Sequence, residues 1–265
     1  MTQKHLRSIF ISDTHLGNKN TQANHLLHFL ETHTCDTLFL VGDIIDLWKM
    51  SKKGHWPASH QKVMSKFFEI AASDTRVVYI PGNHDPFFRE LANLQLGHIE
   101  VYQEYVHTLA DGKRMLIVHG DCFDGDVHYN RLLHKIGDMC YDSAVTINRW
   151  VASLRQSLGL RYWSISTAVK LKSKKAQTYI ERFERVAVAR AKARGMDGII
   201  CGHIHQGKLA EIEGIVYGND GDWLESCSTI LEAQDGSLSL LHVSKGYESK
   251  AGELKPRPVM AATEA

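Results

Sequence analysis

Short apolar runs alternate with segments of helical periodicity over the first 120 residues, and this alternation constrains the fold more than any other feature. The apolar runs are rich in β-branched and aromatic residues, which is typical of strands; they are 7–12, 37–41, 77–80 and 115–118. Between them, 21–33 and 57–73 place apolar residues at helical spacing. Because this order favours a buried, mostly parallel sheet, we predict an α/β fold.

The character of the chain changes after residue 125. Strand signals disappear, and 144–160 and 176–195 have the pattern of amphipathic helices. Strand signals then return, at 198–201, 214–217, 227–232 and 237–243. We therefore predict one sheet-based core interrupted by a helical cap and followed by a flexible tail. The core is 1–125 and 196–245, the cap is 126–195, and the tail is 246–265.

The charge of the chain is balanced overall but not along its length. The 31 Lys and Arg against 30 Asp and Glu, with 43% hydrophobic residues, exclude a disordered chain or a basic nucleic-acid coat. Residues 126–195 hold 14 basic and 5 acidic residues, a net charge of +9, and the remainder carries −8. A basic segment beside an acidic body indicates an anion site or a metal site, although the lysines can also simply coat solvated helices.

Cysteine usage and apolar length bear on the compartment. The five cysteines are widely spaced and form no C-x-x-C pair, which argues against a disulfide framework or a thiolate zinc site. The first residues lack a secretory signal pattern. The longest apolar stretch, 37–48, is interrupted by Asp43 and Asp46 and falls far short of the ~20 residues of a membrane span. We expect a cytoplasmic protein.

Five predicted strands end on residues that bind metal ions. The motifs are 12-SDTH-15, 42-GDIID-46, 82-GNHD-85, 119-HGD-121 and 202-GHIH-205. In an open α/β sheet, ligands bind beyond the carboxyl ends of the strands, so these distant segments are expected to converge. Carboxylate, imidazole and amide groups suit divalent ions such as Mn²⁺, Fe²⁺ or Zn²⁺. The 16 histidines of the chain fit the same interpretation.

In their order and spacing these motifs resemble the signature of the calcineurin-like metallophosphoesterases. The resemblance implies a four-layer α/β/β/α sandwich that holds two divalent metal ions, for which we expect Mn²⁺ first and Fe²⁺ or Zn²⁺ as alternatives. The family pattern assigns one metal to Asp13, His15 and His205, the other to Asn83, His119 and His203, and makes Asp43 the bridge.

The expected reaction is hydrolysis of a phosphoester. Two cations lower the pKa of a bridging water, so a metal-bridging hydroxide attacks phosphorus while the cations neutralise the developing charge. In the family pattern His84 lies near the leaving group, and we expect it to protonate that group. Asp85 either orients His84 or caps its own loop. Asp46 is expected to contact the metal-binding side chains without binding a metal itself.

Within the superfamily, the chain most resembles the UDP-2,3-diacylglucosamine pyrophosphatases. The shared features are 11-ISDTHLG-17, 43-DIIDLW-48, the helical insertion after 119-HGD-121, and 217-YGNDGDWLESCS-228. The resemblance implies cleavage of the pyrophosphate of UDP-2,3-diacylglucosamine, a step of lipid A biosynthesis, to UMP and the lipid monophosphate. The substrate contacts it implies are Asp126, Tyr129, Lys172, Lys174 and Lys175. The apolar residues of the cap then hold acyl chains or only pack, and its basic residues are able to meet an anionic membrane.

Three other functions are weighed against this one. Many of those enzymes carry Arg where this chain has His84, so a phosphodiesterase or phosphatase for soluble nucleotides is the alternative substrate class. A metal-binding scaffold without catalysis is disfavoured because all seven ligand positions are filled. A nuclease is disfavoured because the cap shows no recognised single-strand platform, and no nucleic-acid partner is expected.

Overall fold

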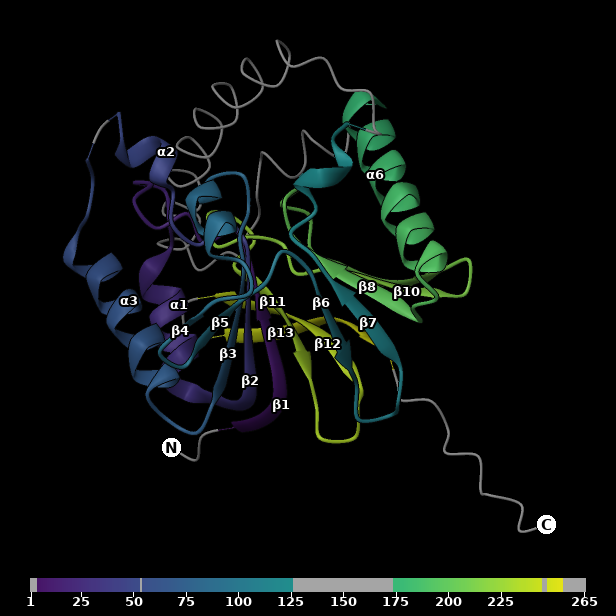
Figure 1. Cartoon of the computed structure of the whole chain (residues 1–265), viewed down its shortest axis with the longest axis horizontal. Helices are drawn as coiled ribbons and strands as arrows, with labels where there is room; N and C mark the ends of the chain where they lie inside the picture. Colours follow the sequence, from purple (N-terminus) through teal and green to yellow (C-terminus); the bar gives the residue numbers. More distant parts are fainter. Residues whose placement is uncertain (1–3, 53, 126–173, 245–246, 255–265) are drawn as a thin grey trace.

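Two mixed β-sheets face each other in the computed structural model, which describes residues 4–52, 54–125, 174–244 and 247–254 (Figure 1). The larger sheet has the strand order β13-β12-β11-β1-β2-β3-β5-β4. Its strands are β1 (Lys4–Ile11), β2 (His33–Val41), β3 (Arg76–Ile80), β4 (Gln95–Leu96), β5 (Ile99–Val101), β11 (Ser228–Glu232), β12 (Leu238–Ser244) and β13 (Tyr247–Leu254). The smaller sheet has the order β6-β7-β8-β10-β9. Its strands are β6 (Tyr105–Thr108), β7 (Arg114–Ile117), β8 (Gly198–Cys201), β9 (Lys208–Ile212) and β10 (Ile215–Asn219).

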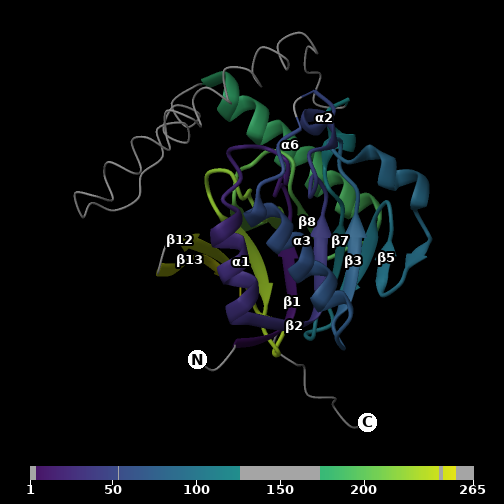
Figure 2. The same cartoon turned by 90° about the vertical axis from the view of Figure 1, so that its left-hand side faces the viewer.

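Helices cover the outer faces of both sheets. On the larger sheet they are α1 (Ala23–Thr32) and α3 (Ala58–Ala71), which lie side by side in Figure 2. On the smaller sheet the cover is α6 (Lys174–Ala193). The short helices α2 (Leu47–Met50), η1 (Pro86–Leu91) and η2 (Asp121–Phe123) lie in the connections. The arrangement is the four-layer α/β/β/α sandwich that the sequence resemblance implied.

Each interface between layers has its own apolar cluster. Leu26 and Phe29 of α1 belong to the outer cluster of the larger sheet, and Phe183 of α6 belongs to that of the smaller sheet. Between the sheets, Phe10 and Phe39 stack with ring centroids 4.8 Å apart. These side chains are fully buried, and each contributes about 1.5–3 kcal/mol relative to an exposed position. Apolar runs on the strands therefore build the frame that carries the loops.

Parallel pairing sends the motif loops to one end of the sandwich. Strand β2 pairs in parallel with both β1 and β3, so the segments that follow these three strands leave the larger sheet at the same edge. In the smaller sheet β7 and β8 are also parallel, and the segments that begin at His119 and Gly202 leave together. Strands β6 and β7, which are consecutive in the chain, pair antiparallel.

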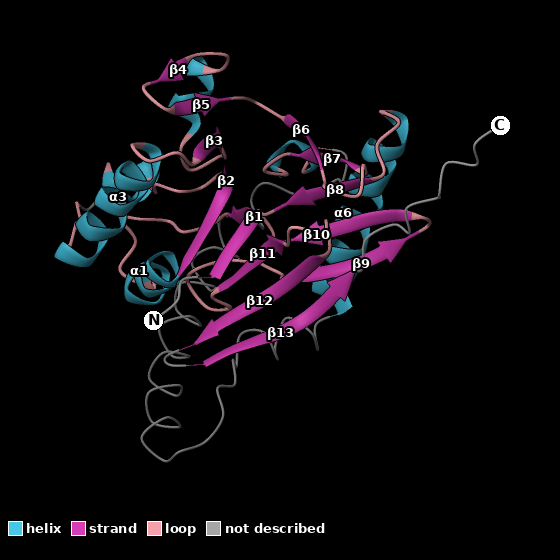
Figure 3. Cartoon of the chain, turned by 90° about the horizontal axis from the view of Figure 1, so that it is seen from below, coloured by secondary structure: helices cyan, strands magenta, loops and turns pink. Residues whose placement is uncertain are grey.

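Two predicted boundaries are wrong. Residues 174–195 were placed in the cap, but α6 packs on the core sheet through an apolar face that includes Ala187 and Val188. The tail was expected to be flexible from residue 246, but β13 pairs with β12 at the edge of the larger sheet (Figure 3). An edge strand forms through backbone hydrogen bonds, which need no apolar run in the sequence. The remainder of the predicted cap, 126–173, lies outside the described residues.

Among the described helices, none combines the length and apolar character needed to cross a membrane.

Candidate metal centre

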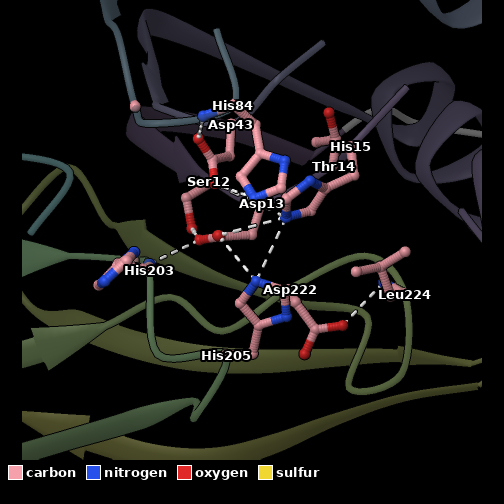
Figure 4. Close-up of polar contacts among 12 residues, drawn as sticks. Ser12, Asp13, Thr14, His15, Asp43, His84, His203, His205, Asp222 and Leu224 are labelled. Atoms are coloured by element: carbon pink, nitrogen blue, oxygen red, sulfur yellow. Dashed lines mark hydrogen bonds and ion pairs between the residues drawn. The ribbon is translucent and has the colours of Figure 1, made fainter. Parts of the chain in front are cut away.

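The five motif segments follow the carboxyl ends of β1, β2, β3, β7 and β8. Figure 4 shows residues of four of these segments, with the side chains of Asp13, His15 and His205 close together. Side chains from them form three groups whose donor atoms lie within 4.8 Å of one another. The groups are Asp13, His15 and His205; Asp13, Asp43 and His119; and His15, Asp46 and His84. Five of the seven predicted metal ligands therefore belong to a single connected cluster, in which Asp13 and His15 are each shared by two groups.

The first group has its donor atoms at close range around Asp13, which is fully buried. Asp13 Oδ1 lies 3.0 Å from His205 Nε2 and 3.7 Å from His15 Nε2. The two imidazole Nε2 atoms are 3.3 Å apart. Three donor atoms from segments nearly 200 residues apart thus point toward one another, which is the arrangement that a shared cation requires.

In the second group, one ring nitrogen of His119 makes no hydrogen bond within the described residues. His119 donates from Nδ1 to the carbonyl of Val41 at 2.8 Å, so its lone pair remains on Nε2. That Nε2 is buried, makes no hydrogen bond within the described part of the chain, and lies 3.5 Å from Asp43 Oδ2. Asp43 Oδ2 is also 3.8 Å from His15 Nε2, so it faces both groups. An orphaned imidazole nitrogen beside a carboxylate fits a divalent cation.

Backbone conformation singles out the same residues. Among the described residues, eight that are not glycine have positive φ, and five of them are predicted ligands: Asp13, His15, Asp43, His203 and His205. Left-handed backbone costs free energy in residues other than glycine and is concentrated at functional sites. The surrounding packing holds these residues in place. A Cβ on Gly82, for example, would lie 2.2 Å from Asp43 Oδ1.

The electrostatics of the cluster reflect densely packed opposite charges. Burial disfavours the charged form of His15, but Asp13 and Asp46 outweigh it and raise the pKa of His15 to about 10. Burial likewise opposes ionisation of Asp43, but His119 and His15 hold its pKa well below the usual range. The carboxylates therefore stay anionic and attract positive charge into a buried site, which is the property a cation site needs.

His84, the predicted proton donor, is held at the rim of the cluster. Its backbone N–H donates to Asp43 Oδ1 at 2.7 Å, and its Nδ1 lies 3.0 Å from Asp46 Oδ1. Asp46 is fully buried, and the same oxygen accepts the N–H of Lys49 at 2.9 Å as the N-cap of α2. The other oxygen of Asp46 lies 3.4 Å from His15 Nδ1. Asp46 thus orients the His84 imidazole, while its second oxygen faces His15 Nδ1 without a hydrogen bond.

The interpretation of Asp85 as the residue that orients His84 is wrong. Its Oδ1 accepts the N–H of Gly82 at 2.6 Å, and its Oδ2 accepts from the Ile44 N–H at 2.9 Å and from the Tyr79 hydroxyl. Burial, followed by the nearby Asp43, raises the pKa of Asp85. Oδ1 thus holds the 82–85 loop itself, and Oδ2 ties that loop to the 42–46 loop and to Tyr79. The alternative that Asp85 caps its own loop is the one the geometry supports.

His203 is anchored separately. Its backbone N–H donates to Asp13 Oδ2 at 2.8 Å, and its Nε2 lies 3.0 Å from both carboxylate oxygens of Asp124. Sequence reasoning missed Asp124, because only its position three residues beyond 119-HGD-121 hinted at a place near the site. The remaining predicted ligand, Asn83, follows Gly82 and is exposed.

Three of the five predicted substrate contacts lie in a segment that the structure does not describe. Asp126, Tyr129 and Lys172 lie outside the described residues. Lys174 and Lys175 are the first two residues of α6.

Comparison with known proteins decides the family. The model of the calcineurin-like phosphoesterases matches residues 6–207, a stretch that contains all five motifs. The chain belongs to the calcineurin-like phosphoesterase family. This calcineurin-like phosphoesterase is accordingly a metal-dependent phosphoester hydrolase.

Several curated proteins named UDP-2,3-diacylglucosamine hydrolase match most of this chain at modest identity. The phosphoesterase is 25% identical to the protein of Psychromonas ingrahamii, over 89% of this chain and 97% of that protein. It is 23% identical to that of Haemophilus influenzae, over 86% and 95%. It is 26% identical to that of Ralstonia nicotianae, over 87% and 90%.

The solved structures that resemble this chain are more distant in sequence. The phosphoesterase Yfce from E. coli has a TM-score of 0.48 and 15% identity, over 94% of this chain and 99% of that one. Vacuolar protein sorting 29 from Cryptosporidium parvum has a TM-score of 0.48 and 13% identity, over 94% and 97%.

Proposed function

We propose that this chain holds two divalent cations and hydrolyses a phosphoester between them. One cation is assigned to Asp13, His15 and His205, the other to Asn83, His119 and His203, with Asp43 shared by both. The observation that carries the assignment is the buried, unbonded Nε2 of His119 facing Asp43 Oδ2. Mn²⁺ is the first choice because the set combines hard carboxylates with imidazoles and lacks thiolate.

The residues around the cations have separable tasks. When bound, a pair of divalent cations activates water near neutral pH and neutralises charge on the phosphate. His84 donates a proton to the leaving oxygen, since its side chain is 24% exposed at the rim while Asp46 holds its Nδ1. Asp46 and Asp85 keep the loops of β2 and β3 in register, so neither needs to touch substrate.

The substrate we propose is UDP-2,3-diacylglucosamine, cleaved at its pyrophosphate to UMP and the lipid monophosphate. Support comes from the curated hydrolases of that name, which match over 86–97% of both chains in two cases, and from the sequence features quoted above. A protein with this substrate works at the inner face of a membrane, so we also propose a cytoplasmic location with peripheral membrane contact. Many UDP-2,3-diacylglucosamine pyrophosphatases carry Arg where this chain has His84. Soluble nucleotides are therefore the second candidate substrate class.

A substrate panel tests the proposal. Purified protein is stripped with chelator, reloaded separately with Mn²⁺, Fe²⁺ and Zn²⁺, and assayed for UMP release from UDP-2,3-diacylglucosamine in detergent micelles. We expect metal-dependent UMP release that exceeds turnover of cyclic or short soluble nucleotides. Faster turnover of the soluble nucleotides would replace the lipid substrate, and no hydrolysis with any metal would contradict the whole proposal.

The variant His84→Asn serves as the matched control in this panel. Because His84 acts as proton donor and is outside the proposed ligand set, the variant should keep its metal content and lose about 10²–10⁴-fold in turnover. Loss of metal together with activity would instead move His84 into the ligand set.

A further inference from the structure

Asp124 and Tyr179 make a hydrogen-bonded chain that ends on His203. Both carboxylate oxygens of Asp124 lie 3.0 Å from His203 Nε2, and Tyr179 of α6 donates its hydroxyl to Asp124 Oδ1 at 3.0 Å. The His203 side chain is 7% exposed and that of Asp124 is 33% exposed. The chain therefore links the segment after β7, the loop after β8 and the outer helix α6.

Other contacts already fix the backbone of His203 and the packing of its ring. Its backbone is held by the Asp13 carboxylate and has a φ of 69°. Its ring packs against His119, with centroids 5.3 Å apart, and against Phe183 at 6.1 Å. What these contacts leave open is which ring nitrogen carries the proton. A carboxylate at Nε2 settles this, because Nε2 then donates its proton and the lone pair remains on Nδ1.

We propose that Asp124 is a positioning residue that holds His203 in the Nε2-protonated form, and that Tyr179 holds Asp124 in place. This inference rests on the proposed function, since it takes His203 as a metal ligand. A carboxylate that accepts from the second nitrogen of a ligating imidazole fixes the ring and increases its basicity. The outer helix α6 thereby contributes to the metal site without contacting it.

Metal affinity of the stripped protein is the first measurement. We expect Asp124→Ala to weaken Mn²⁺ binding by about 10- to 100-fold in titration calorimetry, the range found for outer-shell partners. Asp124→Asn keeps an oxygen that accepts the Nε2 proton, so it should retain part of the affinity. Tyr179→Phe should lose less than Asp124→Ala. Asp74→Asn, which changes an exposed carboxylate next to β3, is the matched control and should bind as the unchanged protein does.

The state of the His203 ring is the second measurement. Ring ¹⁵N spectra of the metal-free protein, with the His203 signals assigned from their absence in His203→Gln, report which nitrogen is protonated. We expect Nε2 protonation in the unchanged protein and a mixture of both forms in Asp124→Ala. A role limited to folding would lower the unfolding temperature and leave these signals in place.

The outcomes separate this inference from the proposed function. Unchanged Mn²⁺ affinity and ring signals in Asp124→Ala would overturn the inference, whatever the enzyme hydrolyses. Weaker Mn²⁺ binding and a mixed ring state would support it even if no phosphoester is cleaved, in which case only the proposed function fails. If Asp124→Ala does not fold, Asp124→Asn and Tyr179→Phe decide by the same two measurements.

Discussion

Two clusters of buried carboxylate and imidazole groups are built on β1, and they differ in how their polar atoms are satisfied. Near the middle of the strand, Glu232 is fully buried opposite Ser8. Its Oε1 accepts from Arg7 and from the Ala110 N–H, and its Oε2 accepts from Ser8 Oγ at 2.5 Å and His107 Nε2 at 2.7 Å. Within the described residues, no buried side-chain atom of this Glu232 cluster lacks a hydrogen-bond partner, and the cluster joins the two sheets.

At the end of the same strand the metal-centre cluster is arranged differently. Asp13, Asp43 and His119 face one another with donor atoms a few ångströms apart, and His119 Nε2 has no hydrogen-bond partner in the described part of the chain. A buried polar atom without a partner costs about 1–3 kcal/mol, and left-handed backbone adds to that cost. Burial of charge is common to both clusters, so the unsatisfied atoms, not the burial, mark the functional one.

The largest effect on stability is expected from a substitution that breaks the Glu232 cluster. Glu232→Ala should lower the free energy of unfolding by about 3–5 kcal/mol, because it leaves Arg7 and His107 as uncompensated charges or donors. Urea unfolding in the presence of chelator measures this loss. Mn²⁺ stoichiometry at low temperature should not change. Glu211→Ala, at an exposed position of β9, is the control and should stay within about 0.5 kcal/mol of the unchanged protein.

Breaking the metal-centre cluster should lower metal affinity and turnover more than stability. Asp43→Asn removes the charge that faces both groups, so metal affinity and turnover should fall by more than the roughly 100-fold seen for outer-shell substitutions. The amide oxygen still accepts the His84 N–H, so this backbone contact is kept in the metal-free protein. Retention of both metals by Asp43→Asn would contradict the assignment of Asp43 as the shared residue.

A smaller effect distinguishes the two carboxylates around His84. Asp46→Asn should lower kcat by about 10- to 100-fold with less change in KM, because a neutral amide replaces the carboxylate that faces His84 Nδ1. Asp85→Asn should mainly lower the unfolding temperature, since Asp85 bonds to loop backbone and to Tyr79. Steady-state kinetics and thermal unfolding of both variants make the comparison. The reverse pattern would reinstate Asp85 as the residue that orients His84.

The smallest effect concerns a third buried imidazole, His60 on α3. Its Nδ1 accepts the N–H of Gly17 at 2.9 Å, and burial followed by the nearby His55 lowers its pKa to about 4. The unfolded chain binds a proton near pH 6.5 and the folded chain does not, so stability is lost as pH falls from 6.5 toward 4. The loss should be on the order of 1 kcal/mol by pH 5.5.

Urea unfolding of the metal-free protein between pH 7.5 and 5 measures this dependence. His60→Asn, whose amide oxygen is also an acceptor, should show a shallower slope over the same range. Equal slopes in the two proteins would mean that His60 titrates alike in the folded and unfolded chains.

The strands and the ligand segments were predictable because both signals are local. Apolar runs of four to six residues specify strands, and a residue directly after a parallel strand has a known place at the sheet edge. The convergence of Asp13, Asp43 and His119 was therefore predictable from the sequence. In contrast, β13 was missed because 247-YESKAGEL-254 contains no apolar run, and its pairing with β12 uses backbone groups that every residue carries.

The choice between Asp46 and Asp85 illustrates the same limit at the site. Both follow a strand, both are acidic, and Asp85 is adjacent to His84 in sequence, which favoured the wrong residue. Adjacent residues on an extended loop point in different directions, so the neighbour in sequence is not the neighbour in space. Asp124 gave even less signal, because its partner His203 lies 79 positions away.

The sequence by itself determined the sandwich, the end of it that carries the chemistry, and the residue types offered to a cation, because periodicity and strand-end position are properties of short segments. Only the tertiary structure decided which carboxylate holds which imidazole, and which buried cluster is satisfied and which is not. Hydrogen bonds between side chains act over about 3 Å and depend on direction, so they are settled only when segments distant in the chain are packed together.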